Sequence, residues 1–302
     1  MERRGFMGKR ERLNAFQLFN YGWFVLFTLI CVFPFYYLFI NTISNNDLSS
    51  RGLVLFYPLD IHLTNYANVF KLPGLGLAAV VSLSRTVIGT ALTVFSSAFL
   101  GYLFTKNEMW GRKFWYRFLI ITMYFNAGLI PWYLTMLNLG LVNNFLVYIL
   151  PAIVSPFFII LVKTFIESTP AALQESAQID GAGYWVIFTK IILPLSMPIL
   201  ATISIFAAVG QWNSFTDTLF LVTNQKLFSL QFILYRYMNE ATSLAQLMRQ
   251  TSGAVNIDLT NMATPTSIRT TVSMVVVTPI LLVYPFFQRF FVKGIMIGAV
   301  KG

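Results

Sequence analysis

Residues 22–40 read GWFVLFTLICVFPFYYLFI, a run of 19 residues that contains no charged side chain. A helix of about 20 apolar residues crosses a bilayer, because each residue rises about 1.5 Å and the hydrocarbon is about 30 Å thick. The run is too long for the apolar part of a signal peptide, and no small-residue cleavage site ends it. It therefore predicts a retained membrane-spanning helix.

Five further windows have the same character, and none of them contains Lys, Arg, Asp or Glu. A charge at the centre of a bilayer costs about 2.5–3.5 kcal/mol on insertion scales, so six such windows are not expected by chance. Only 11% of the 302 residues are charged, against about a quarter in soluble domains. The sequence thus predicts an all-α polytopic membrane protein with six transmembrane helices. The further windows are residues 86–104, 118–137, 145–162, 191–216 and 270–288.

The distribution of Lys and Arg orients these helices. With both termini in the cytoplasm, 14 basic residues lie inside and 7 outside, as the enrichment of basic residues in cytoplasmic loops requires. The net charge of +10 then reflects topology, and no zinc-ligand spacing or aromatic RNA-binding motif points to nucleic acid. We expect a basic cytoplasmic segment (1–17), a transmembrane domain (18–291) with outer loops at about 41–85 and 217–269, and a cytoplasmic tail (292–302).

The sequence carries no constellation of residues for catalysis. It has no Gly-x-x-x-x-Gly-Lys-Ser/Thr phosphate loop, so no ATP site is visible. Cys31 is the only cysteine and lies in the first apolar run, and His62 is the only histidine and lies in an outer loop. A thiolate or histidine metal site therefore lacks ligands. We expect no catalytic residue, no metal and no cofactor on this chain.

Residues 168–194, between the fourth and fifth windows, read STPAALQESAQIDGAGYWVIFTKIILP. Thr169 is placed to cap a helix that starts at Pro170 and runs to about Asp180. Gly181 follows, where the end of a helix favours a left-handed residue. The sequence predicts a helix, a glycine bend and a second helix, which together form a compact knob on the cytoplasmic face.

The second half of the knob is amphipathic and leads into the fifth window. Its large apolar residues are expected on one side; they are Tyr184, Trp185, Phe188, Ile191 and Ile192. Pro194 marks the start of the next span. On the first helix Ser176 and Ala177 are small, which would let the backbone sit deep in a groove of a partner protein.

Here the chain resembles the permease subunits of ATP-binding cassette importers. Their cytoplasmic signature is Glu-Ala-Ala, a glycine four residues after the second alanine, and a terminal Leu-Pro. The matching residues are Glu175, Ser176, Ala177, Gly181, Leu193 and Pro194, with Ser176 in place of the first alanine. Asp180 beside the glycine, NLGLVN at 138–143, QWN at 211–213 and the tail at 291–302 are similar to the carbohydrate branch, the relatives of the maltose permease pair.

The resemblance implies a larger transport machine. Its parts would be a second homologous permease subunit, two ATPase subunits that hold ATP and Mg, and an extracytoplasmic sugar-binding protein that delivers an oligosaccharide. The machine would lie in the plasma membrane of a prokaryote, and the ATPases would push on the knob of each permease. Within the branch, the chain looks most like the six-span second subunit and like permeases for complex or plant-derived oligosaccharides.

Polar residues in the predicted spans suggest a sugar pathway. Spans three and five carry uncharged amides beside indole rings, a combination that suits the hydroxyls and the apolar ring faces of sugars. The candidates are Asn126, Trp132, Gln211, Trp212 and Asn213. Hydrogen bonds between helices are the more frequent use of such side chains.

Two other functions stay open at this point. An ion-coupled secondary sugar transporter would hold its ion with carboxylates or broken helices near the midplane, but no window contains a carboxylate, and Asp217 lies just beyond the fifth. That alternative leaves the knob unexplained. The second alternative, a membrane scaffold without transport, would not need a polar lining.

Overall fold

The computed structural model describes residues 14–251 and 264–299, and within these ranges every regular element is a helix. Three stretches are long and apolar enough to cross a membrane on their own. They are α1 (Ala15–Thr42), α4 (Leu75–Leu103) and residues Thr266–Val283 of α14 (Pro265–Ala299). The all-helical fold class that the sequence predicts is thus confirmed for the described residues.

Two further crossings consist of bent pairs of helices. The segment Phe145–Ala152, which holds the short helices η1 (Phe145–Tyr148) and η2 (Leu150–Ala152), meets α7 (Pro156–Glu167) at 44°. The segment Tyr184–Leu195 meets α11 (Met197–Asn213) at 78°. If each pair counts as one span, the described residues hold up to five spans.

The third predicted window, residues 118–137, is not one helix. It is divided between α5 (Arg112–Tyr124) and α6 (Leu129–Asn138), with Phe125 extended and Gly128 at a φ of 88°. Oδ1 of Asn126 accepts the backbone N–H of Gly128 at 2.9 Å, a local bond that competes with helix hydrogen bonding. The expectation of one continuous helix here is wrong, and six spans stay a prediction.

The centre of the bundle is formed by α4, α7 and α11. Their buried side chains meet those of the segment that follows α8 (Ala172–Ile179), in one apolar cluster that includes Tyr102, Val162, Phe188 and Ile203. Gly101 allows α4 to approach α7 closely, because a Cβ atom at this position would lie 3.0 Å from Cγ1 of Val162. α4 also has buried residues from Leu75 to Tyr102, so it is a central helix of the bundle.

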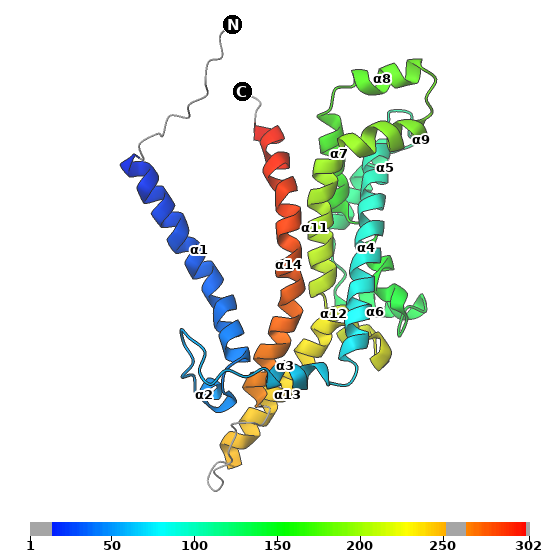
Figure 1. The fold of residues 1–302 in the computed structure, drawn as a ribbon. Coiled ribbons are helices and arrows are strands. Elements are labelled where there is room, and N and C mark those ends of the chain that lie inside the picture. Colours follow the sequence, from blue (N-terminus) through cyan, green and yellow to red (C-terminus); the bar gives the residue numbers. More distant parts are fainter. Residues whose placement is uncertain (1–13, 252–263, 300–302) are drawn as a thin grey trace.

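Different helices lie at the two ends of the molecule. α8 lies at one end, together with the first residue of α1 and the last of α14 (Figure 1). At the opposite end lie α2 (Asn46–Ser50), α3 (Thr64–Phe70) and α13 (Leu230–Thr251). The predicted outer segments are therefore largely helical, and they are separated from the knob by the length of the bundle. Much of the basic segment 1–17, residues 252–263 of the second outer segment and the last three residues of the tail lie outside the described residues.

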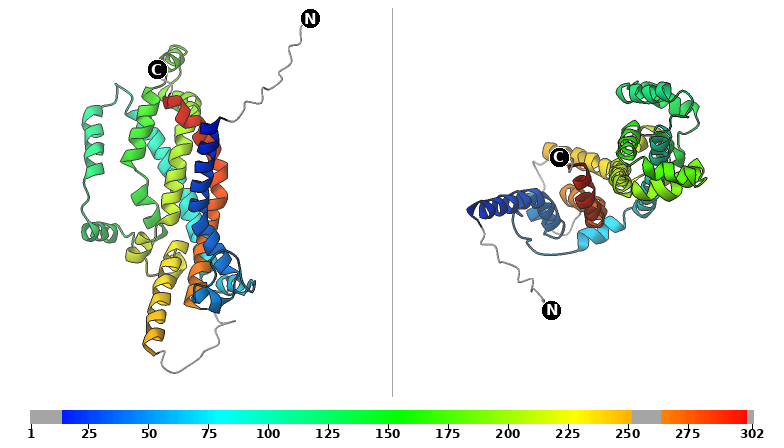
Figure 2. Two further views of the ribbon diagram at one scale, coloured as in Figure 1. Left: turned by 90° about the vertical axis from the view of Figure 1, so that its left-hand side faces the viewer. Right: turned by 90° about the horizontal axis from the view of Figure 1, so that it is seen from above.

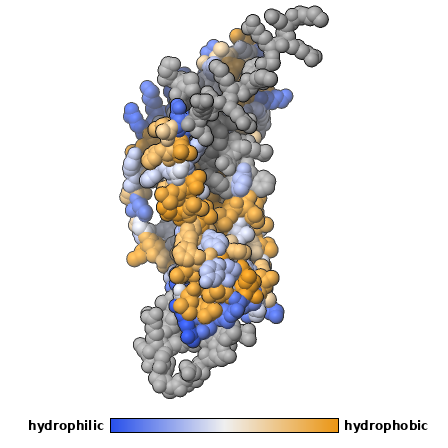
Figure 3. All heavy atoms as spheres, turned by 60° about the vertical axis from the view of Figure 1, so that its left-hand side comes forward, coloured by the Kyte–Doolittle hydropathy of each residue, from blue (hydrophilic) through white to orange (hydrophobic). Residues whose placement is uncertain are grey.

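α1 is the least covered of the long helices. Only its last residues, Ile40, Asn41 and Thr42, are buried, and the helix leans away from α14 toward the end that carries α8 (Figures 1 and 2). On the face that carries α1, hydrophobic residues gather in a band across the middle, with hydrophilic residues toward both ends (Figure 3). Such a band is what a bilayer requires of the surface it surrounds.

Candidate functional site

The predicted knob is present as two helical segments joined by a glycine. α8 ends at Ile179, and Gly181 has a φ of 80°, so the predicted left-handed bend is confirmed. The predicted cap is wrong. The hydroxyl of Thr169 donates to the carbonyl of Ile166 at 2.6 Å and so completes the end of α7, and α8 begins only after Ala171.

The second half of the knob divides its apolar residues between interior and surface. α9 (Tyr184–Ile187) continues into a π-helix, η3 (Phe188–Ile192), and into α10 (Leu193–Leu195), where Pro194 occupies the first turn. Phe188 and Ile192 are buried as expected, whereas Tyr184 and Trp185 are 51% and 58% exposed. The predicted face is therefore only partly buried. The ring of Trp185 still lies 5.6 Å from that of Phe188, so the two side chains share a side, and the start of α9 is exposed.

α8 presents most of its surface to the outside. Glu175, Ser176, Asp180 and Gly181 are exposed, and Ala177 is partly buried against the central apolar cluster. Ile179, next to the bend, is 87% exposed. Leu193 also packs against that cluster, while Pro194 is exposed. The structure thus brings the predicted coupling residues to one end of the molecule, on two segments that share the glycine bend.

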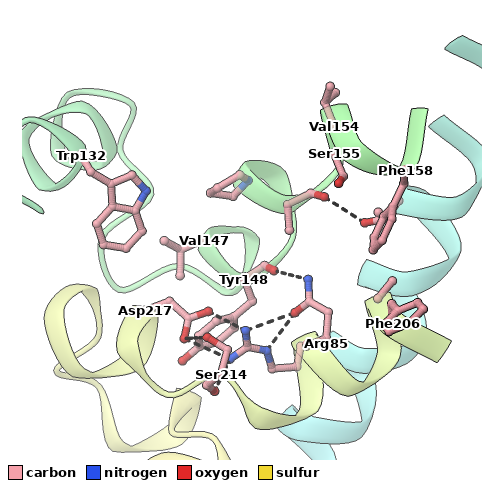
Figure 4. Close-up of a pocket in the computed structure, with 16 residues that line it drawn as sticks. Arg85, Trp132, Val147, Tyr148, Val154, Ser155, Phe158, Phe206, Ser214 and Asp217 are labelled. Atoms are coloured by element: carbon pink, nitrogen blue, oxygen red, sulfur yellow. Dashed lines mark hydrogen bonds and ion pairs between the residues drawn. The ribbon is translucent and has the colours of Figure 1, made fainter. Parts of the chain in front are cut away.

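A second candidate site is a cavity of about 430 Å³ between α4, the bent pair that ends in α7, and α11. Figure 4 shows its lining. Apolar and aromatic side chains predominate, and one group of polar side chains, Gln211, Ser214 and Asp217, surrounds a buried arginine. The lining residues are Arg85, Thr93, Trp132, Val147, Tyr148, Pro151, Ala152, Val154, Ser155, Phe158, Phe206, Ala207, Gly210, Gln211, Ser214 and Asp217.

Arg85 is only 2% exposed, and all its N–H groups have acceptors. Nε and Nη2 donate to Oε1 of Gln211 at 3.2 and 3.1 Å. Nη1 donates to the carbonyl of Ser214 and to Oδ1 of Asp217, each at 3.2 Å, and Nη2 donates to Oδ2 of Asp217 at 2.5 Å. A buried charge is tolerated only with such complete pairing.

Other contacts extend this cluster to further elements. The guanidinium carbon of Arg85 lies 4.3 Å from the centre of the Tyr148 ring, and Nε2 of Gln211 donates to the carbonyl of Tyr148 at 3.1 Å. A Cβ at Gly89 would lie 2.7 Å from Nε2 of Gln211, so glycine there makes room for the amide. The cluster therefore joins α4 to η1, α11 and α12 (Thr216–Leu221).

The five predicted pathway residues do not form one site. Trp132 and Gln211 line the cavity, whereas Asn126, Trp212 and Asn213 do not. The indole N–H of Trp212 donates to the carbonyl of Val276 at 3.1 Å and ties α11 to α14. Asn126 bonds within its own turn, and Asn213 is exposed at the end of α11.

Sequence analysis missed the arginine, its carboxylate and Tyr148. Arg85 directly precedes an uncharged window and Asp217 directly follows another, so position in the sequence predicts that each lies at the edge of an outer loop. Opposite charges at the ends of two apolar windows were the available signal. That signal does not show by itself that the two residues meet, because they are 132 positions apart.

Comparison with known proteins gives one consistent result. Residues 97–297 match the family model described as binding-protein-dependent transport system inner membrane component. The polygalacturonan/rhamnogalacturonan transport system permease protein YtcP of Bacillus subtilis (strain 168) is 33% identical over 291 residues, which cover 96% of this chain and 99% of that protein. Protein LplC of the same organism is 36% identical over 276 residues, or 90% of each chain.

The fold has a solved counterpart as well. A chain in the crystal structure of a bacterial ABC transporter involved in the import of the acidic polysaccharide alginate superposes with a TM-score of 0.79. The two chains are 27% identical, and the match covers 91% of this chain and 96% of the other.

Proposed function

The chain belongs to the family of binding-protein-dependent transport system inner membrane components, and on this premise we propose that it forms half of the passage of an oligosaccharide importer. It is a transport subunit of the ATP-binding cassette type without an ATPase site of its own. The ion-coupled transporter, the alternative that the sequence left open, has no support among its relatives. The observation that carries the proposal is similarity over nearly the whole chain to permeases of this kind.

The substrate class follows from the relatives and from the cavity. YtcP is named for polygalacturonan and rhamnogalacturonan, and the structural counterpart belongs to an alginate importer. The cavity offers an indole and an amide, at Trp132 and Gln211, beside apolar rings, which suits the two kinds of surface on a sugar. Its only charged lining residues, Arg85 and Asp217, neutralise each other. We assign to it an oligosaccharide, of which this cavity contacts one part.

The partners follow from the same premise. The importer contains a second homologous permease subunit, two ATPase subunits that bind ATP and Mg, and an extracytoplasmic sugar-binding protein. The knob formed by α8 and α9 receives the ATPase, with Glu175 and Asp180 at its surface and the small residues Ser176 and Ala177 allowing close approach. Support comes from the exposure of α8 and from its place at one end of the bundle.

The topology assigned to the chain is six spans, with both termini and the knob in the cytoplasm. Cysteine labelling tests it in a Cys31→Ala background, since Cys31 is the only native cysteine. Ile179 and Tyr57 are 87% and 67% exposed and lie in the knob and in the opposite outer segment. Ile179→Cys should react with a membrane-impermeant reagent only after permeabilisation, and Tyr57→Cys in intact cells. The reverse pattern would overturn the orientation.

Reconstitution tests the function itself. The chain is co-expressed with its partner permease and ATPase subunits and placed in liposomes with ATP inside, and uptake of oligosaccharides delivered by the binding protein is measured. Trp132→Ala should reduce uptake while the ATPase still copurifies, and Asn213→Ala, outside the cavity, should not. Uptake by this chain alone, driven by a proton or sodium gradient, would contradict the proposal.

A further inference from the structure

Lys106 lies just beyond the last turn of α4, and in Figure 1 α9 lies at this end of α4. Its side chain is partly buried. Nζ donates a hydrogen bond to Oε1 of Gln174 at 2.5 Å, and Gln174 belongs to α8. The ammonium therefore links two elements that are 68 positions apart in the sequence.

The same ammonium lies over two aromatic rings. Nζ is 4.6 Å from the centre of the Tyr102 ring, on α4, and 5.6 Å from that of Tyr184, on α9. Both distances fall within the range of cation–π attraction. The hydroxyl of Tyr102 also donates to the carbonyl of Tyr184 at 3.4 Å, and its ring stacks on Phe188 at 5.4 Å. One cation thus contacts α4, α8 and α9 at once.

Partial burial of the Lys106 ammonium affects its pKa. Removal from water lowers the pKa of Lys106 below the usual lysine value, and the nearby carboxylate of Glu108 acts in the opposite direction. A partly desolvated ammonium is held in place when its neighbours replace the lost water. The amide of Gln174 and the two rings do so here.

The covalent structure shows why such a link matters. α8 follows α7 directly and α9 leads into α11 through η3 and α10, so a push on the knob reaches these two helices along the chain. α4 is not adjacent to the knob in sequence and can follow it only through packing and through side-chain contacts. Yet α4 carries Arg85 and Thr93, which line the cavity.

We propose that Lys106 is a positioning residue that couples the knob to α4, so that displacement of the knob by the ATPase is transmitted along α4 to the cavity. This inference rests on the proposed function, in which the knob receives the ATPase. It assigns the transmission to a side chain outside the Glu175 to Pro194 segment. The ammonium holds Gln174 from α8 and the Tyr184 ring from α9 against the end of the same helix.

The test is the number of sugar molecules imported per ATP hydrolysed by the complete complex in proteoliposomes. Lys106→Met should lower this ratio by up to about tenfold, because two ring contacts of ordinary strength together correspond to about one decade. The ATPase should still copurify and hydrolyse ATP. Lys106→Arg should restore most of the ratio, since a guanidinium also stacks on rings and donates to an amide.

Lys163→Met is the matched control. Lys163 also lies over a tyrosine, 4.7 Å from the ring centre of Tyr116, and pairs with Glu167 at 2.7 Å, but none of these partners belongs to the knob. The number of sugar molecules imported per ATP by the Lys163→Met complex should equal that of the wild type. Gln174→Leu removes only the α8 contact and tests the link from the other side, should Lys106→Met fail to assemble.

Three results would overturn the proposal. They are a wild-type ratio in Lys106→Met, a ratio equally lowered in Lys163→Met, and loss of the ATPase from a folded Lys106→Met complex, which would make the residue part of the docking surface. If the Lys106→Met complex does not assemble, a wild-type ratio in Gln174→Leu would also overturn the proposal. Absence of sugar import by the wild-type complex would instead refute the proposed function.

Discussion

Two cations are associated with α4, Arg85 within the helix and Lys106 just beyond its last turn, and they are held in different ways. Arg85 is buried, with every N–H group paired and a carboxylate at 2.5 Å. Lys106 is partly buried, with one amide acceptor and two rings. A guanidinium keeps its charge and presents a planar fork, whereas an ammonium is a compact charge on a flexible stem that responds to its surroundings. The comparison indicates a rigid contact at the cavity, the fixed joint around Arg85, and a weaker contact at the knob, the adjustable joint around Lys106.

The largest effect is expected from breaking the fixed joint. Arg85→Met would leave the carboxylate of Asp217 and the amide of Gln211 without their donor in a buried site. Removal of one partner from such a pair costs about 3–5 kcal/mol. The solubilised complex should lose thermal stability or fail to assemble, as followed by size-exclusion chromatography and thermal unfolding. Arg51→Met is the control, because Arg51 pairs with Asp47 on the surface with 68% of its side chain exposed.

A second substitution separates a lost contact from an orphaned charge. In the double variant Arg85→Met with Asp217→Leu, both charges are absent, and apolar replacement of a buried pair is often close to neutral. Part of the lost stability should return. If the double variant is less stable than Arg85→Met alone, the carboxylate has another essential partner, such as the N–H of Thr218, to which it is bonded at 2.9 Å.

A smaller effect at the same joint is expected from Gly89→Ala. The added methyl would lie 2.7 Å from Nε2 of Gln211, closer than packed atoms allow. Overpacking of this kind costs about 1–3 kcal/mol, and here it would displace the amide that holds Arg85. We expect a lower unfolding temperature than that of Gly76→Ala, a change on the same helix with open space around it. Equal temperatures would show that Gln211 moves freely.

How much of the fold and of the site the sequence could predict depends on how far apart along the chain the interacting residues lie. The apolar windows, the bend at Gly181 and the exposed helix before it depend on neighbouring residues, and sequence analysis found them. The break at Asn126 depends on one local hydrogen bond inside an apolar run, which the hydropathy of that run conceals. The pairs of Arg85 with Asp217 and of Lys106 with Gln174 join distant positions, and a single sequence does not show which distant residues meet.

At the adjustable end, Gly181→Val should disturb coupling without unfolding the spans. Gly181 has a φ of 80° with nothing near its missing side chain, so the penalty is confined to the backbone. A β-branched residue in that conformation is strained by about 1–3 kcal/mol, which should shift α8 relative to α9. Sugar uptake should fall while the unfolding temperature of the membrane domain is kept.

Gly183→Val is the matched control for that variant. Gly183 lies two residues away, also in open space, but its φ is −70°, which any residue adopts. It should keep wild-type uptake. Equal loss in both variants would mean that bulk near the bend, and not its backbone conformation, impairs docking. Wild-type uptake in Gly181→Val would remove the glycine bend from the coupling mechanism.

The smallest expected effect is a dependence of coupling on alkaline pH. Because burial lowers the pKa of Lys106 below 10.5 against the opposing influence of Glu108, the folded protein loses this ammonium at a lower pH than an exposed lysine would. Between the two pKa values the unfolded chain binds the proton and the folded chain does not, so this group's contribution to stability rises with pH. Its attraction to the rings of Tyr102 and Tyr184 disappears over the same interval.

The ratio of sugar imported to ATP hydrolysed should therefore decline as pH rises through that interval, by less than on removal of the whole side chain, because a neutral amine still donates to Gln174. Lys106→Arg supplies the comparison, since a guanidinium stays protonated throughout. Its ratio should stay level where that of the wild type falls, and the pH dependence of the ATPase itself cancels in the ratio. A parallel decline in both proteins would place the titrating group elsewhere.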